Sequence, residues 1–93
     1  MDQLDAMKLF VRVAELESFT RCAEQLGIPK ATLSAAIRRL EERMGTRLLL
    51  RTTRRVQLTT DGQLCSARCR DLLADMAEFN GLFRQGGQIS GQL

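Results

Sequence analysis

The chain has 93 residues, enough for one small domain, and a globular composition with 44% hydrophobic and 27% charged residues. It contains no Trp or Tyr and only four Phe, so we expect a mostly aliphatic core. No apolar run approaches the ~20 residues that span a membrane, and the N-terminal MDQLDAMKLF has acidic residues where a signal peptide has basic ones. These features argue against a membrane partner and predict a cytoplasmic protein.

Two amphipathic helices are expected at the start. Asp2 can cap the first, in which apolar residues recur at helical spacing up to about Leu16. They are Leu4, Met7, Phe10, Val11 and Ala14. Ser18 can cap a shorter second helix, which Gly27 ends because glycine readily takes the left-handed turn after a helix. Its apolar face comprises Phe19, Cys22, Ala23 and Leu26.

A third helix should begin at Pro29 and end at Gly45. Proline suits the first turn, where its fixed φ and missing N–H do no harm. The expected core stripe is Leu33, Ile37, Leu40 and Met44. The second and third helices are joined by a tight turn, so the sequence predicts a helix-turn-helix.

The positive charge of the chain is concentrated in residues 30–55. This segment holds eight of the fourteen basic residues and two of the eleven acidic ones, a local net charge of +6, whereas the rest of the chain carries −3. Such a concentration is typical of a protein that binds a polyanion such as DNA.

The third helix carries small and basic residues on the side opposite its core stripe, around its N-terminal half. That half is where recognition helices contact base edges, and small side chains let a helix approach the floor of the groove. The predicted base-contacting residues are Lys30, Ala31, Ser34, Ala35 and Arg38. The alternative is an ordinary solvated face whose alanines only favour the helix.

A β-hairpin is expected next. Two strand-like segments, 47–51 and 56–59, flank a basic tip, although no Asn-Gly turn joins them. Arginine suits phosphates and narrow minor grooves, and hydroxyl groups or a helix N-terminus can also hold a phosphate. The residues expected at the DNA backbone or minor groove are Ser18, Thr20, Thr32, Arg51, Thr52, Thr53 and Arg54. The alternative for the tip is a charged edge that blocks sheet aggregation.

A long last helix should begin at Thr59 or Thr60, because Thr60 and Gln63 have the spacing of a capping box. From Thr60 to Arg84 it would be ~37 Å long, more than a domain of this size needs for its own core. Its apolar residues follow a heptad, which predicts packing against a partner helix. The seam comprises Cys65, Cys69, Leu72, Met76, Phe79 and Phe83.

The cysteines are interpreted as small core or seam residues. Cys65 and Cys69 lie one helical turn apart, but the chain has no His and no second cysteine pair, so a closed zinc site is not expected. An odd number of cysteines also argues against a disulfide framework. We therefore predict no metal and no cofactor.

Four short motifs follow one another along the chain: SFT, AxxLGI, LSxxIxxLExxxGxxLxxR and a closing LTxxG. With them, residues 2–86 resemble the N-terminal DNA-binding domain of bacterial LysR-type transcriptional regulators. The resemblance implies a winged helix-turn-helix, a long last helix that pairs antiparallel with its mate in a homodimer, and a further C-terminal domain that would sense a small-molecule effector.

The same resemblance places Lys30, Ala31, Ser34 and Ala35 at base-contacting positions and Arg54 in the minor groove. The family often has Gln-Pro at the positions of Lys30 and Ala31, and Arg at that of Ala35. Since alanine removes a potential guanine contact, the DNA site of other members cannot be carried over.

We predict a mainly α protein, a three-helix core plus a small β-hairpin wing with a long C-terminal linker helix. The expected division is a winged helix-turn-helix at 1–59, a dimerisation helix at 60–85 and a flexible linker at 86–93. The predicted function is sequence-specific binding of double-stranded DNA by a dimeric regulator, without catalysis. Two alternatives remain: a protein-interaction module built on the heptad helix, and a nonspecific architectural DNA binder, which usually carries an apolar wedge that this tip lacks.

Overall fold

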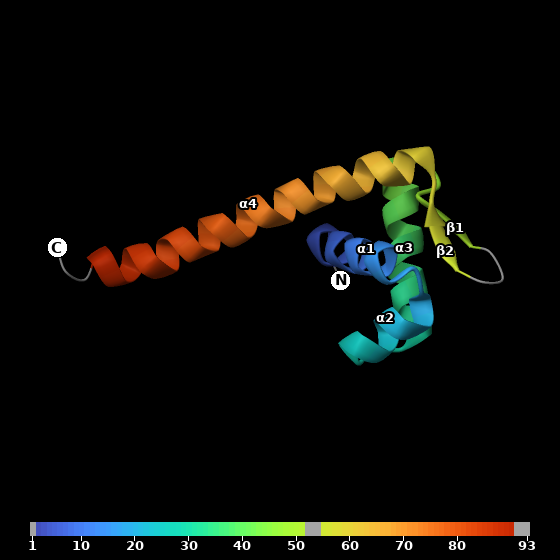
Figure 1. Cartoon of the computed structure of the whole chain (residues 1–93), viewed down its shortest axis with the longest axis horizontal. Coiled ribbons are helices and arrows are strands. Elements are labelled where there is room, and N and C mark those ends of the chain that lie inside the picture. The colour runs from blue at the N-terminus through green and yellow to red at the C-terminus, as the bar shows by residue number, and fades with distance from the viewer. Residues whose placement is uncertain (1, 52–54, 91–93) are drawn as a thin grey trace.

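The computed structural model describes residues 2–51 and 55–90, with side-chain surroundings up to residue 84. Three helices, a hairpin and a long helix follow one another (Figure 1). Their bounds are α1 Gln3–Leu16, α2 Phe19–Leu26, α3 Lys30–Met44, β1 Leu49–Arg51, β2 Val56–Leu58 and α4 Thr60–Ser90. The two strands pair antiparallel with Leu50 opposite Gln57. This confirms the predicted mainly α winged helix-turn-helix architecture.

The ends of the first three helices follow the local signals in the sequence. The carboxylate of Asp2 accepts the Asp5 N–H at 2.8 Å, and the hydroxyl of Ser18 accepts the Arg21 N–H at 3.1 Å. Gly27 and Gly45 take the left-handed conformation after α2 and α3, with φ of 67° and 73°. The predicted ends at Leu16, Gly27 and Gly45 are confirmed, because capping is decided by residues within one turn of each other. The third helix begins at Lys30, and Pro29 is its N-cap and not part of its first turn.

The hydrophobic core lies between α1 and α3 and is closed by the hairpin and the first turns of α4. Its largest fully buried side chains are Phe10, Leu33, Ile37, Leu40, Leu48, Leu49, Val13 and Cys22. Met44, predicted in the core stripe, is 41% exposed, and Leu26, predicted on the apolar face of the second helix, is 43% exposed. Both lie in the last turn of a helix, where the neighbouring helix no longer covers them.

The last helix begins at Thr60, one of the two predicted starting residues. The hydroxyl of Thr59 accepts the Gly62 N–H at 2.8 Å and donates to the Arg47 carbonyl at 2.6 Å. Thr59 is therefore the cap, and the box predicted from Thr60 and Gln63 is wrong because Thr60 already lies inside the helix. The helix also continues past the expected end near Arg84 and reaches Ser90. In Figure 1 it projects well beyond the body formed by the other elements.

Gly62, in the first turn of α4, packs directly against the backbone of Leu48. A Cβ at this position would overlap the Leu48 carbonyl oxygen and carbon and press on the Leu58 side chain. Since the obstacle is backbone, it cannot rotate away. The close approach of α4 to the hairpin therefore requires glycine here.

We expect Gly62→Ala to lower the free energy of unfolding by ~1–3 kcal/mol, the usual cost of overpacking, as measured by urea denaturation. Gly81→Ala is the matched control. It lies in the same helix, a Cβ added there would meet no atom within 4 Å, and the variant should gain up to ~1 kcal/mol from the better helix propensity of alanine. Equal midpoints for the two variants would contradict the packing argument.

Candidate nucleic-acid interface

The predicted base-contacting residues lie together on the outer face of α3. Lys30, Ala31, Ala35 and Arg38 are exposed and Ser34 is partly exposed. The opposite face of the same helix is the core stripe, in which Leu33 and Ile37 are fully buried. The structure thus presents a ridge of short side chains with a basic residue near each end.

The N-terminus of α3 is open. Pro29 occupies the N-cap position and makes no side-chain hydrogen bond to the first turn. The first N–H groups of a helix have no partner inside the helix, and together with the helix dipole they attract anions. An anionic group that approaches the Lys30 end of α3 therefore meets both a positive side chain and unpaired backbone donors.

The two hydroxyl residues of α2 differ in availability. Ser18 is partly buried and its oxygen already accepts the Arg21 N–H, whereas Thr20 is exposed. Thr20 also lines a shallow hollow between α2 and α3 that Lys30 borders from the other side. Thr32 is exposed on the opposite flank of α3. The predicted backbone-contacting residues therefore flank the α3 ridge on both sides.

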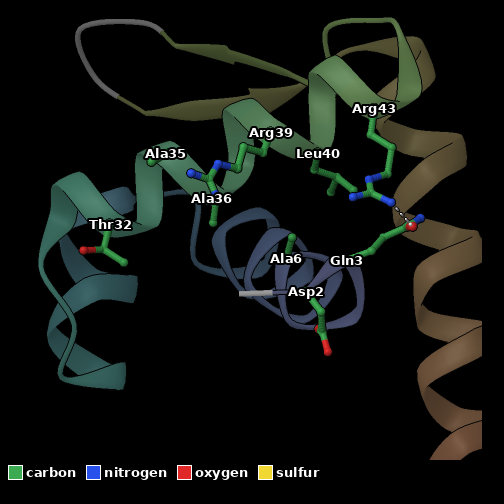
Figure 2. A pocket seen from close by; sticks show the side chains of 9 residues that line it. All are labelled: Asp2, Gln3, Ala6, Thr32, Ala35, Ala36, Arg39, Leu40 and Arg43. Carbon is green, nitrogen blue, oxygen red and sulfur yellow. Dashed lines mark hydrogen bonds between the residues drawn. The ribbon is translucent and has the colours of Figure 1, made fainter.

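A second hollow, with a volume of about 380 Å³, separates α3 from the start of α1. Figure 2 shows the Arg39 side chain extending back along α3 towards Ala35 and Ala36, whereas Arg43 reaches across to α1. The Arg43 guanidinium donates to the Gln3 amide oxygen at 3.0 Å. Among the described residues no acidic group pairs with Arg39, so its charge is available beside the ridge residue Ala35.

The sequence analysis did not predict Arg39 as a DNA-contacting residue. The signal that could have found it is the pair of alanines three and four positions before it, because long side chains on a helix point towards its N-terminus. Two small residues there leave room for the guanidinium to lie over the N-terminal half of α3.

The wing is attached to the body at the corner between α1 and α2. The Val56 N–H donates to the Glu17 carbonyl at 3.1 Å, and Arg55 forms an ion pair with the Glu17 carboxylate at 3.4 Å. The Arg51 guanidinium lies 4.2 Å from the centre of the Phe19 ring, a cation–π distance. The predicted tip residues Thr52, Thr53 and Arg54 lie outside the described residues.

Glu41 joins the C-terminal half of α3 to the first strand. One of its carboxylate oxygens accepts the N–H groups of Leu48 at 2.8 Å and of Leu49 at 3.2 Å. The same oxygen lies 3.7 Å from the Arg47 guanidinium, and the Glu41 side chain is only 15% exposed. Hydrogen bonds to a charged, partly buried acceptor are stronger than neutral ones, so this contact holds the wing in a fixed orientation relative to α3.

The predicted seam of α4 divides into two parts. Cys69 is 3% exposed and belongs to the core of its own chain, and Cys65 is half-buried against the same core. The prediction that Cys69 faces a partner is therefore wrong, because the first turns of α4 pack on α1, where Arg70 also lies 3.9 Å from Glu15. Leu72, Met76, Phe79 and Phe83 are 38–61% exposed.

The described part of the chain has neither a cluster of metal-holding side chains nor a membrane-spanning helix. It contains no group of three or more His, Cys, Asp or Glu side chains placed to hold a metal ion. Burial, with a smaller contribution from Cys65, raises the pKa of the Cys69 thiol to about 12, so this thiol stays protonated at neutral pH. Of the helices described, none combines the length and apolarity that a membrane span requires.

Comparison with known protein families identifies the family of this domain. The family model for the bacterial regulatory helix-turn-helix protein, lysR family, matches residues 4–63. The chain belongs to the LysR family. The four motifs that suggested the resemblance all lie within this match, and the helix-turn-helix and wing described above are the matched elements.

Relatives of this LysR-family domain are themselves regulators. The HTH-type transcriptional regulator YhjC of Escherichia coli is 49% identical over 94 residues, covering 100% of this chain and 31% of the relative. An HTH-type transcriptional repressor of Pseudomonas aeruginosa is 45% identical over 86 residues, covering 92% of this chain and 27% of the relative. The chain thus spans about a third or less of these relatives' length.

Solved structures agree with the family assignment. The BenM DNA-binding domain, in complex with its catB site 1 DNA, superposes on the LysR-family chain with a TM-score of 0.86. It is 33% identical, and the match covers 91% of this chain and 93% of that one.

We expect Glu41→Gln to lower the free energy of unfolding by ~1–2 kcal/mol, because two charge-assisted hydrogen bonds to the Leu48 and Leu49 N–H groups become weaker neutral ones. Glu42→Gln is the matched control, since Glu42 is exposed and adjacent in sequence. Thermal or urea unfolding measures both variants. If they unfold at the same midpoint, Glu41 does not anchor the wing.

Proposed function

We propose that this domain binds double-stranded DNA in a sequence-specific manner and does so for transcription regulation. The observation that carries the proposal is the exposed ridge of α3, with short side chains in its centre, basic residues beside them and an uncapped helix N-terminus. A helix with this surface fits the major groove, where small side chains allow close approach to base edges. The structural match to a domain solved in a DNA complex supports the same interpretation.

In this proposal the residues on the ridge contact bases and those on its flanks contact phosphates. Lys30, Ala31, Ser34, Ala35 and Arg38 form the base-contacting set, with Arg39 added from the structure. The wing reaches the adjacent minor groove or backbone through Arg51, Thr52, Thr53 and Arg54, while Ser18, Thr20 and Thr32 contact the backbone. Phosphate contacts fix the position of the protein, and base contacts supply the specificity.

The exposed half of α4 supports a homodimer. Leu72, Phe79 and Phe83 are 53%, 59% and 61% exposed, and the rings of Phe79 and Phe83 lie 4.7 Å apart in an edge-on arrangement. A continuous apolar stripe on a helix that projects from the domain is costly in water and suits pairing with a second copy. Two copies would present two α3 ridges to two half-sites.

In this proposal the whole regulator needs further residues besides those of this domain. Because the relatives are about three times as long, we place effector sensing in a further C-terminal domain, with a small molecule as the effector. The domain itself has no catalytic role in this proposal. The two competing functions, an interaction module on α4 and a nonspecific DNA binder, are outcomes of the following test.

The proposal is tested by fluorescence anisotropy, with the chain titrated against DNA from upstream of its own gene and against scrambled DNA at several salt concentrations. A preference of ~10³-fold or more for the native DNA is the expected result. Equal binding to both DNAs with a steep salt dependence would leave only a nonspecific phosphate binder. No binding by a confirmed dimer would favour the interaction module.

We expect Arg39→Ala to weaken binding to the native DNA by ~1–3 kcal/mol, because its guanidinium lies over the N-terminal half of α3 and pairs with no described acidic group. Arg43→Ala is the matched control, because it removes the same charge from the same helix but from a guanidinium that Gln3 already holds. This variant should weaken DNA binding far less. Anisotropy at moderate salt compares the two variants. Equal losses would mean that only net charge matters.

We expect Leu72→Asp to shift the chain from dimer to monomer, because it introduces a charge into the exposed apolar stripe. Sedimentation equilibrium measures the change. Ala74→Asp is the control, since Ala74 is an exposed residue of the same helix outside the heptad seam. A Leu72→Asp variant that remains dimeric would show that α4 does not pair through this stripe.

A further inference from the structure

The turn between α1 and α2 contains a residue in a strained backbone conformation. Glu17 has φ 54° and ψ 28°, and among the described residues it is the one residue other than glycine with a positive φ. The Cβ of an L-residue is crowded in this left-handed region, so the position after a helix is usually glycine, as at Gly27 and Gly45. The Glu17 side chain is 50% exposed, so burial does not explain why glutamate stands here.

Glu17 connects the end of α1 to the wing. Its N–H donates to the Val13 carbonyl at 2.8 Å and closes α1, while its carbonyl accepts the N–H of Val56, the first residue of β2, at 3.1 Å. In a continuing helix that carbonyl would accept from the residue four positions further on, so the left-handed turn makes it available to the strand. The Glu17 carboxylate lies 3.4 Å from the guanidinium of Arg55, the residue before Val56.

The other strand of the wing is held two residues further along the same corner. The guanidinium of Arg51, at the end of β1, lies 4.2 Å from the centre of the Phe19 ring, which is buried at the start of α2. Arg51 and Val56 are opposite each other in the hairpin. The corner formed by residues 17–19 therefore contacts both strands at the same level. It also belongs to the helix-turn-helix, because Ser18 caps α2.

We propose that Glu17 is a positioning residue for DNA binding, which holds the wing at the angle where the wing and the α3 ridge contact one duplex. This inference rests on the proposed function. Backbone strain of this kind clusters at functional sites, and a wing that is fixed before binding loses less conformational entropy on the DNA. A positioning role predicts that relief of the strain stabilises the domain but weakens DNA binding. A purely local role at the end of α1 predicts the first effect without the second.

Glu17→Gly removes both the strain and the carboxylate. We expect the melting temperature to rise by up to ~4–8 °C, as for relief of one strained residue in a domain of this size. Binding to the native DNA should weaken ~5-fold or more, because a loosened wing must be ordered on the DNA. Loss of an acidic residue alone would strengthen binding to a polyanion, so net charge cannot produce this result. Unchanged affinity, or stability and affinity that fall together, would overturn the proposal.

Two further variants isolate the carboxylate. Asp and Asn have the same shape and enter the left-handed region more readily than other residues with a side chain. Glu17→Asp should keep near wild-type affinity, whereas Glu17→Asn should bind ~3–5-fold more weakly, the scale of one exposed ion pair. Glu24→Gln is the charge control, because Glu24 is exposed and lines the hollow between α2 and α3; it should bind DNA as tightly as the wild type or more tightly. Equal affinities of the Asp and Asn variants would exclude a role of the carboxylate.

Hydrogen exchange measured without DNA keeps this inference separate from the proposed function. The Glu17 carbonyl protects the Val56 N–H, and we expect this N–H to exchange ~10-fold faster in Glu17→Gly than in the wild type, although the variant is more stable. An unchanged Val56 rate would overturn the positioning role whatever the DNA result. A wild type without preference for the native DNA would instead overturn the proposed function, and the exchange rate would still decide whether Glu17 holds the wing.

Discussion

The architecture depends on the backbone of Leu48 and Leu49, where three elements meet. The Glu41 carboxylate of α3 binds the two N–H groups, the Thr59 N–H donates to the Leu48 carbonyl at 3.0 Å, and Gly62 of α4 packs against that same carbonyl. Both leucine side chains are buried in the core. A change at this junction would therefore alter the angles of the wing and of α4 relative to α3 together.

This junction matters because the ridge and the wing must contact one DNA molecule at the same time. Their separation is set by α3 on one side and by the attachment of the hairpin to Glu17 on the other. Both attachments use backbone groups of the hairpin, which fix position more tightly than contacts between long side chains. A wing held in this way enters binding preorganised, with less conformational entropy to lose.

The structure also sorts the arginines into different roles. Arg12 pairs with Glu15 at 3.2 Å, Arg43 with Gln3, and Arg47 approaches Glu41, so these guanidinium groups are held by the protein itself. Arg38 and Arg39 have no such acidic partner among the described residues. The high net charge of residues 30–55 thus overstates the number of arginine side chains that are available to DNA. The arginines on α3 without an acidic partner are the ones that can contact phosphates or bases.

Much of the fold follows from local sequence signals. The caps Asp2 and Ser18, the terminating Gly27 and Gly45, and the helical spacing of apolar residues act over one or two turns, so the sequence by itself determined the helices, the hairpin and the ridge of α3. The sequence left the cap of α4 open between two adjacent threonines, because they offer equivalent local signals and only the Arg47 carbonyl selects Thr59.

Only the tertiary structure decided which apolar residues are covered and which charges are free. Periodicity assigned Met44 to the core and Cys69 to the seam, yet Met44 is 41% exposed and Cys69 is 3% exposed, because burial depends on where a neighbouring helix begins and ends. The hydrogen bond that holds the Arg43 guanidinium on Gln3 likewise arises from packing between segments far apart in the chain. Sequence spacing specifies a face of a helix, and the packing of other helices decides what that face meets.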